Sequence, residues 1–164
     1  MNPYAKFLGN RDPLEVAANT PARIGAMIRG LSPKQLAWRP APGKWSIRGI
    51  ITHLTETEMV MCCRARWIAF EENPTLVPFD QEKWAKGWVR EKEPLGEILE
   101  RFRLLRRSQL RLFRGASSRD LKRAGFHPER GVVTLRVQLE TLAGHDLNHL
   151  EQIQRLATRL RAKG

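Results

Sequence analysis

Residues 139–156 read LETLAGHDLNHLEQIQRL, a strongly helical stretch with two histidines four residues apart. His145 and His149 therefore lie one turn apart on the same helix face, close enough together to bind a single ion. Two ligands from one helix seldom complete a metal site, so we expect a third donor elsewhere in the chain. The remaining histidines are His53, in a second helical stretch, and His127, in a predicted loop.

The inward seam of this last helix is apolar except at two positions. Polar residues in such a seam are costly to bury unless they are paired or coordinated. We therefore expect Asp146 and His149 to have partners. The seam comprises Leu135, Leu139, Leu142, Asp146, His149, Ile153, Leu156 and Leu160.

Length and composition favour one all-helical domain. The chain has 164 residues, enough to bury a core, with 41% hydrophobic and 28% charged residues, which is a soluble globular balance. Tyr is nearly absent, and Val, Ile and Thr are sparse beside Leu, Ala, Arg and Glu. This bias favours helices over strands.

The N-terminal residues lack the apolar core of a signal peptide, and no stretch approaches the roughly 18 apolar residues that span a bilayer. We therefore expect a cytoplasmic protein with no membrane partner. Cys62 and Cys63 are adjacent, and adjacent cysteines in a helix cannot form an unstrained disulfide, so we interpret them as reduced thiols. Lys and Arg outnumber Asp and Glu by 29 to 17, so the surface should attract anions.

Hydrophobic periodicity predicts four long helices, two crossover-like connections and a final loop. Pro21 interrupts the first helix, which either bends there or restarts after Thr20; we favour one bent helix ending at Gly30. The first connection should contain a short turn at 32–36, and the second a short helix at 82–88. The predicted helices cover residues 13–30, 46–70, 95–114 and 134–160.

The second and third helices have recognisable apolar stripes. The stripe of the second helix comprises Ile47, Ile50, Leu54, Met61, Ala65 and Ile68, with His53 on its flank. The seam of the third comprises Leu95, Ile98, Phe102, Leu105, Gln109 and Leu112.

These features together predict an all-α fold, a four-helix bundle with a divalent metal between the second and fourth helices. Three histidine ligands would leave a position open for water or substrate, as in catalytic sites, and Zn or Ni suits imidazole donors. Histidine pairs at this spacing also arise by chance and are more often exposed or hydrogen-bonded; the polar interruption of the seam adds some support for a metal. Candidates to orient the ligands or transfer protons are Glu56, Glu58, Asp146 and Gln152.

Two further pairs are open to a functional or a packing interpretation. Trp84 and Trp88 lie four residues apart near the second connection, where they could line the lip of a pocket or simply pack. Cys62 and Cys63 are too far along the helix from His53 to share its ion, and we favour a packing role for them.

Several motifs follow one another along nearly the whole chain. They are Trp38-Arg39-Pro40 with Pro42 to Ile47, His53-Leu54 with Glu58, His127 to Gly131, and Gly144 to Leu150 with Gln152-Ile153. With these motifs the chain resembles the DinB-like (YfiT-type) superfamily.

This resemblance implies a four-helix bundle of up-down-down-up connectivity, often dimeric, with a divalent metal held by three histidines. Those ligands fall here on His53, His145 and His149. Some members are thiol S-transferases or isomerases that use low-molecular-weight thiols such as bacillithiol or mycothiol, and many others are described only as metal-dependent hydrolases. We therefore expect a homodimer that binds a small-molecule substrate or thiol.

The basic charge supports a rival hypothesis, nucleic-acid binding. Nine basic residues and one acidic residue lie between Arg101 and Arg123, and a stripe on the solvent side of the third helix could bind phosphates or other anions. No helix-turn-helix or other DNA-reading motif accompanies the stripe, and no aromatic residues alternate with its arginines. We therefore rank nucleic-acid binding below the metal site. A third hypothesis is a non-catalytic protein that binds a metal or small ligand under stress. The stripe comprises Arg103, Arg107, Arg111 and Arg114.

Overall fold

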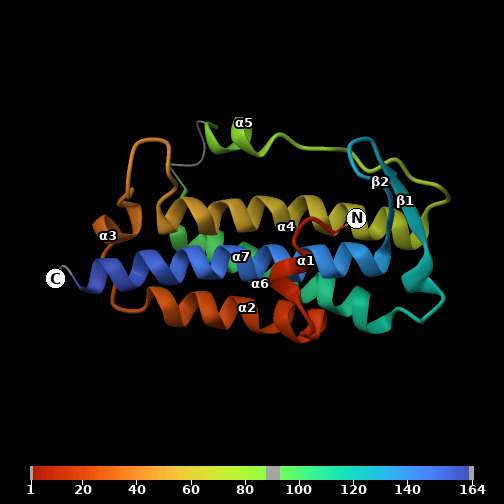
Figure 1. Ribbon diagram of the computed structural model, residues 1–164, viewed down its shortest axis with the longest axis horizontal. Helices are drawn as coiled ribbons and strands as arrows, with labels where there is room; N and C mark the ends of the chain where they lie inside the picture. The colour runs from red at the N-terminus through yellow and green to blue at the C-terminus, as the bar shows by residue number, and fades with distance from the viewer. Residues whose placement is uncertain (1, 88–92, 163–164) are drawn as a thin grey trace.

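Four long helices form the body of the protein, whose computed structural model describes residues 2–87 and 93–162. They are α2 (Pro13–Ile28), α4 (Ile47–Phe70), α6 (Leu95–Gly115) and α7 (Leu135–Arg161). Helices α2 and α7 run in one direction and α4 and α6 in the other (Figure 1). The predicted four-helix bundle of up-down-down-up connectivity is therefore confirmed.

The packing of the helices follows from these directions. Helices α2 and α4 each pack against both α6 and α7, so α2 lies diagonally opposite α4, and α6 lies diagonally opposite α7. Because α4 and α6 are parallel, the chain between them must return along the bundle, and it passes along the outside of α4 with the short helix α5 (Gln81–Ala85) (Figure 1). The first connection, with α3 (Pro33–Ala37), stays at one end. Only the second of the two predicted crossovers therefore runs the length of the bundle.

Side-chain caps start three of the long helices where the sequence predicts. The Asp12 carboxylate accepts from the backbone N–H groups of Leu14 and Glu15, and the Ser46 hydroxyl accepts from that of Gly49. Thr134 caps α7 in the same way. Such caps satisfy N–H groups that have no partner within the helix. Helix α2 continues through Pro21 as one helix, although it ends at Ile28 rather than at Gly30.

A β-hairpin replaces the predicted loop before α7. After a 3-10 turn (Asp120–Lys122), β1 (Ala124–His127) pairs antiparallel with β2 (Gly131–Thr134). The backbone of Phe126 also bonds to that of Pro74 and Leu76. The predicted loop was wrong. Each strand has only four residues, too few to show a clear alternation of apolar and polar side chains, and the backbone bonds to Pro74 and Leu76 come from a distant part of the chain.

The buried faces of α4 and α7 match the predicted stripes. Every predicted stripe residue of α4 is buried, and so is every α7 seam residue except the half-buried Leu156. On α6 the prediction was partly wrong, since Leu105 and Leu112 are only half-buried whereas Arg106 and Phe113 are buried. The face of α6 that meets the core is centred on a charged residue, which a hydrophobic pattern does not count.

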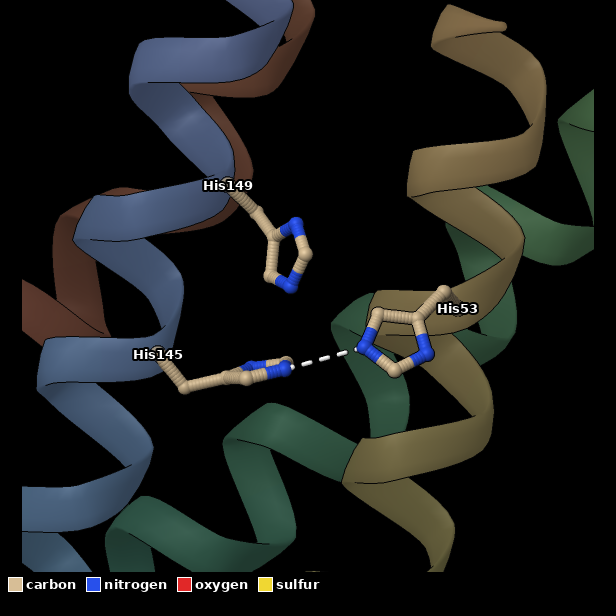
Figure 2. Close-up of side chains that lie close together, drawn as sticks. All are labelled: His53, His145 and His149. Carbon is tan, nitrogen blue, oxygen red and sulfur yellow. Dashed lines mark hydrogen bonds between the residues drawn. The ribbon is translucent and has the colours of Figure 1, made fainter. Parts of the chain in front are cut away.

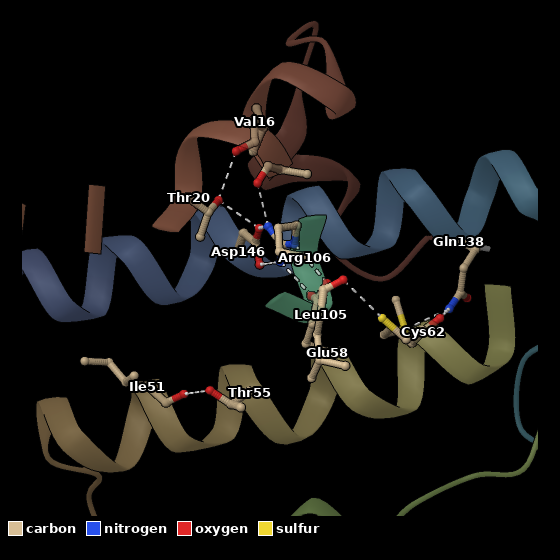
Figure 3. A network of polar contacts seen from close by, with 12 residues as sticks. Val16, Thr20, Ile51, Thr55, Glu58, Cys62, Leu105, Arg106, Gln138 and Asp146 are labelled. Atoms are coloured by element: carbon tan, nitrogen blue, oxygen red, sulfur yellow. Dashed lines mark hydrogen bonds and ion pairs between the residues drawn. The ribbon is translucent and has the colours of Figure 1, made fainter. Parts of the chain in front are cut away.

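Arg106 lies at the centre of a buried polar network that joins all four long helices (Figure 3). Its guanidinium donates to both Glu58 carboxylate oxygens, at 3.0 and 2.8 Å, and to both Asp146 oxygens, at 2.6 and 3.1 Å. It also donates to the carbonyl of Ala17, while the Thr20 hydroxyl donates to Asp146. Burial alone would lower the pKa of Arg106, but the two carboxylates more than reverse this and raise it. The network therefore contains a permanently charged cation.

Replacing Arg106 with methionine should lower the free energy of unfolding by about 3–5 kcal/mol, because two carboxylates would then be buried without their cation. Chemical denaturation measures the difference. The control is Arg107→Met on the exposed face of α6, which should change stability by less than about 0.5 kcal/mol. Equal effects of the two substitutions would contradict a special role for the network.

Candidate metal centre

Three histidines from two helices meet inside the bundle (Figure 2). His53 comes from α4 and His145 and His149 from α7, and each side chain is at most 5% exposed. One ring nitrogen of each lies within 4.8 Å of the others, and the Nε2 atoms of His53 and His145 are 3.0 Å apart. The structure thus brings together the three residues that the sequence analysis selected as ligands.

Antiparallel packing of α4 against α7 produces this arrangement. His145 and His149 share a face of α7 because they are one turn apart, and that face is turned toward α4. The ring centroids of the three histidines are 4.4 to 5.1 Å from one another. Asp146, next to His145 in the chain, is held by Arg106 from α6. The buried network therefore anchors α7 directly beside the cluster.

Burial favours the neutral form of these imidazoles. The pKa of His145 lies well below its ordinary value, first because of burial and then because of the neighbouring His149 and His53. Burial also lowers the pKa of His149 to about 4, although a hydrogen bond with the Gln152 side chain opposes the shift. Neutral imidazole is the form that binds metals.

The geometry and chemistry of the cluster fit a divalent metal. Two nitrogens that each lie about 2.0–2.1 Å from one ion are roughly 3 to 3.5 Å apart, and His53 and His145 are already at 3.0 Å. The contact between the Nε2 atoms of His53 and His145 satisfies one pair of ring nitrogens in the buried cluster of three histidines. Within residues 2–87 and 93–162, it is the only group of histidine, cysteine or acidic side chains with such spacing.

Two aromatic side chains flank the cluster on different sides. The ring centroid of Trp45 is 4.6 Å from that of His53 and 6.2 Å from that of His149. Tyr4 meets His145 edge-on, with centroids 5.1 Å apart. Neither contact follows from local spacing in the sequence, because Tyr4 and His145, and Trp45 and His149, are far apart in the chain.

The N-terminal segment reaches the cluster because of a glycine. A Cβ atom on Gly144 would lie 2.6 Å from the carbonyl oxygen of Tyr4 and 2.8 Å from its Cβ. No side chain fits at such distances. Gly144, in the quoted motif before His145, thus lets the backbone beside the short helix α1 (Ala5–Leu8) lie directly on α7.

The residues predicted to orient the ligands or transfer protons lie in different surroundings. Glu58 and Asp146 are both paired with Arg106, so their carboxylates are committed to the buried network. Gln152 is half-buried and hydrogen-bonds to His149. Glu56 is half-buried on α4, three residues after His53. Roles for any of them in proton transfer stay predictions.

The remaining predicted residues lie outside the cluster. Trp84 is 39% exposed in α5 and meets Phe79 edge-on, whereas Trp88 lies outside the described residues. His127 is buried in β1 instead of lying in a loop, and its Nδ1 accepts from the backbone N–H of Glu129. The four arginines of the predicted anion-binding stripe, Arg103, Arg107, Arg111 and Arg114, are all exposed; their partner stays a prediction.

Comparisons with known proteins agree with the bundle and point to metal chemistry. A model of the DinB superfamily matches residues 18–153. A Bacillus cereus relative is 29% identical over 85% of this chain and 80% of its own length, and one from Oceanobacillus iheyensis is 30% identical over the same shares. Both are named "Putative metal-dependent hydrolase".

A solved structure has the same fold. YfiT from Bacillus subtilis matches with a TM-score of 0.84 and 23% identity, over 91% of this chain and 86% of YfiT. It is described as "a probable metal-dependent hydrolase with an unusual four-helix bundle topology". Among the described helices of the present chain, none is both long and apolar enough to cross a membrane.

Gly144→Ala should release the N-terminal segment, because the added Cβ overlaps backbone atoms of Tyr4 that cannot rotate away. Overpacking of this kind costs about 1–3 kcal/mol, so amide hydrogen exchange at residues 5–9 should accelerate roughly tenfold or more. Gly96→Ala is the matched control, since a Cβ there meets no atom within 4 Å. Unchanged exchange in Gly144→Ala would refute the close approach.

Only one of the two thiols should react in the folded protein. Cys62 is buried, and burial together with the nearby Glu58 raises its pKa to about 12, whereas Cys63 is exposed. A thiol reagent at about pH 8, near the ordinary thiol pKa, should modify one cysteine per chain. Cys63→Ser should abolish the reaction, and Cys62→Ser should leave it intact. Rapid modification of Cys62 would show that its burial is not maintained in solution.

Proposed function

The chain belongs to the DinB superfamily, and from this premise we propose that it is a metal-dependent hydrolase whose divalent ion is held by His53, His145 and His149. The observation that carries the proposal is the convergence of three buried ring nitrogens within 4.8 Å. The names of relatives that match 85% of the chain support the same class of reaction. Zn and Ni are the ions we propose, because both suit imidazole ligands.

A divalent ion held by three imidazoles leaves a coordination position open and supplies Lewis acidity that activates water near neutral pH. The protein's own residues prepare the site for it. Burial keeps His145 and His149 neutral, and the Gln152 side chain lies next to the His149 ring. Trp45 and Tyr4 cover two sides of the cluster and limit the access of bulk water.

Two of the predicted proton-transfer candidates, Glu58 and Asp146, both pair with the buried Arg106, which makes them poor proton acceptors for a reaction at the cluster. Glu56 is half-buried one turn from His53, and we keep it as a candidate proton acceptor on its position alone. Thiol S-transfer and the use of a low-molecular-weight thiol stay expectations from the family resemblance, as does the homodimer.

Tag-free protein should contain about one equivalent of Zn or Ni per chain. His149→Ala should lose most of this metal, because the two remaining ligands, His53 and His145, hold an ion poorly. Elemental mass spectrometry measures both. His127→Ala is the matched control, since this histidine is also buried but lies outside the cluster, and it should keep its metal. Metal-loaded protein should hydrolyse members of an ester and amide panel at a rate that His149→Ala loses.

A wild-type protein that contains no metal and takes up none of the added Zn or Ni would overturn the proposal. Equal metal loss in His127→Ala and His149→Ala would also count against the assigned ligands. A metal-loaded protein that is inactive toward esters and amides but active with thiols would replace hydrolysis by thiol transfer.

A further inference from the structure

A pocket of about 350 Å³ opens beside the histidine cluster, between the first connection and α7. This volume lies in the range of small-molecule sites. Its apolar lining includes Trp45, Ile50 and Leu156. Trp45 is half-buried, Ile50 is 2% exposed and Leu156 is half-buried, so the apolar side chains form the interior of the pocket.

Two residues belong both to the pocket and to the surroundings of the cluster. Trp45 lines the pocket, and its ring centroid lies 4.6 Å from that of His53. Gln152 lines it too and hydrogen-bonds to His149. Ile50 lies one turn before His53 on the same helix. The pocket therefore shares Trp45 and Gln152 with the immediate surroundings of His53 and His149.

Cationic side chains lie where the pocket meets solvent. Lys44, from the first connection, and Arg155, from α7, are both exposed and both line the pocket. Arg155 pairs with Glu151 at 2.9 Å, whereas Lys44 forms no ion pair with any residue in the described part of the chain. The one acidic group in the lining is Glu82 of α5, which is exposed. The lining therefore carries two cations and one carboxylate around an apolar interior.

We propose that this pocket binds a small amphiphilic anion, with its apolar part against Trp45, Ile50 and Leu156 and its acidic head group beside Lys44 and Arg155. An apolar body gains free energy by leaving water, and an anionic head group at the mouth gains from the two cations without being desolvated. The inference rests on the proposed function at one point only, namely that the bound anion is the substrate of the histidine cluster. Binding itself does not require the metal.

Three probes that share a hexyl group and differ in their head groups test this binding directly: hexane-1-sulfonate, hexan-1-ol and hexylammonium. Sulfonate is a weak metal ligand, so its binding reports the pocket rather than the ion. Saturation-transfer NMR and tryptophan fluorescence titration of the full chain, as purified, measure the affinities. Hexanesulfonate should bind at least about fivefold more tightly than hexanol, and hexylammonium most weakly, as expected for one or two solvent-exposed ion pairs.

Variants locate the effect in the pocket. Lys44→Met and Arg155→Met should each weaken sulfonate binding about two- to fivefold and leave hexanol binding unchanged. Arg136→Met, which removes the same charge from an exposed arginine of α7 that pairs with Glu140 at 2.9 Å and does not line the pocket, should change neither. Leu156→Phe should weaken all three probes because the larger ring fills the apolar interior. Melting curves of each variant verify that it is folded.

Equal affinities for the three probes, no binding of any of them, or an equal loss in Arg136→Met would overturn the inference. Its failure is distinguishable from failure of the proposed function. A protein that takes up no added Zn or Ni but still prefers hexanesulfonate would refute the metal-dependent hydrolase and support the anion pocket. Metal-loaded, hydrolytic protein that shows no head-group preference would do the opposite.

Discussion

The bundle depends on one buried cation. Arg106 is 1% exposed and pairs with Glu58 from α4 and Asp146 from α7, while the backbone of α2 accepts a further hydrogen bond from it. A guanidinium in the interior is stable only when its donors are all directed at acceptors, because the desolvation cost of an unpaired charge is several kcal/mol. Its two carboxylates come from different helices, so the network specifies how α4, α6 and α7 are rotated relative to one another.

That rotation is what the histidine cluster requires. His53 lies five residues before Glu58 on α4, and His145 precedes Asp146 directly on α7. Both network carboxylates thus lie within about one and a half turns of a cluster histidine on the same helix. A buried ion pair seldom adds net stability compared with apolar residues of the same volume. Here it joins α4, α6 and α7 next to the three imidazoles, on the same helices that carry them.

The surroundings of the cluster divide into two parts with different physical character. On one side Gly144 admits the N-terminal backbone, and the Tyr4 ring covers His145. On the other side Trp45 separates the cluster from an apolar pocket with cationic residues at its mouth. The exposed arginines of α6 are on a different helix from the residues that line this pocket.

The sequence by itself determined the helices, because caps and hydrophobic periodicity act over a few residues, and it determined the shared face of His145 and His149, because their spacing is one helical turn. It also carried the motifs of the family. Only the tertiary structure decided that His53 reaches His145 across 92 positions of sequence, that Arg106 is buried, that Tyr4 lies against Gly144, and that residues 124–134 form a hairpin. The first three contacts join segments far apart in the chain, so no local pattern encodes them. The strands of the hairpin are neighbours in the chain, but β1 is also bonded to Pro74 and Leu76, about 50 residues earlier.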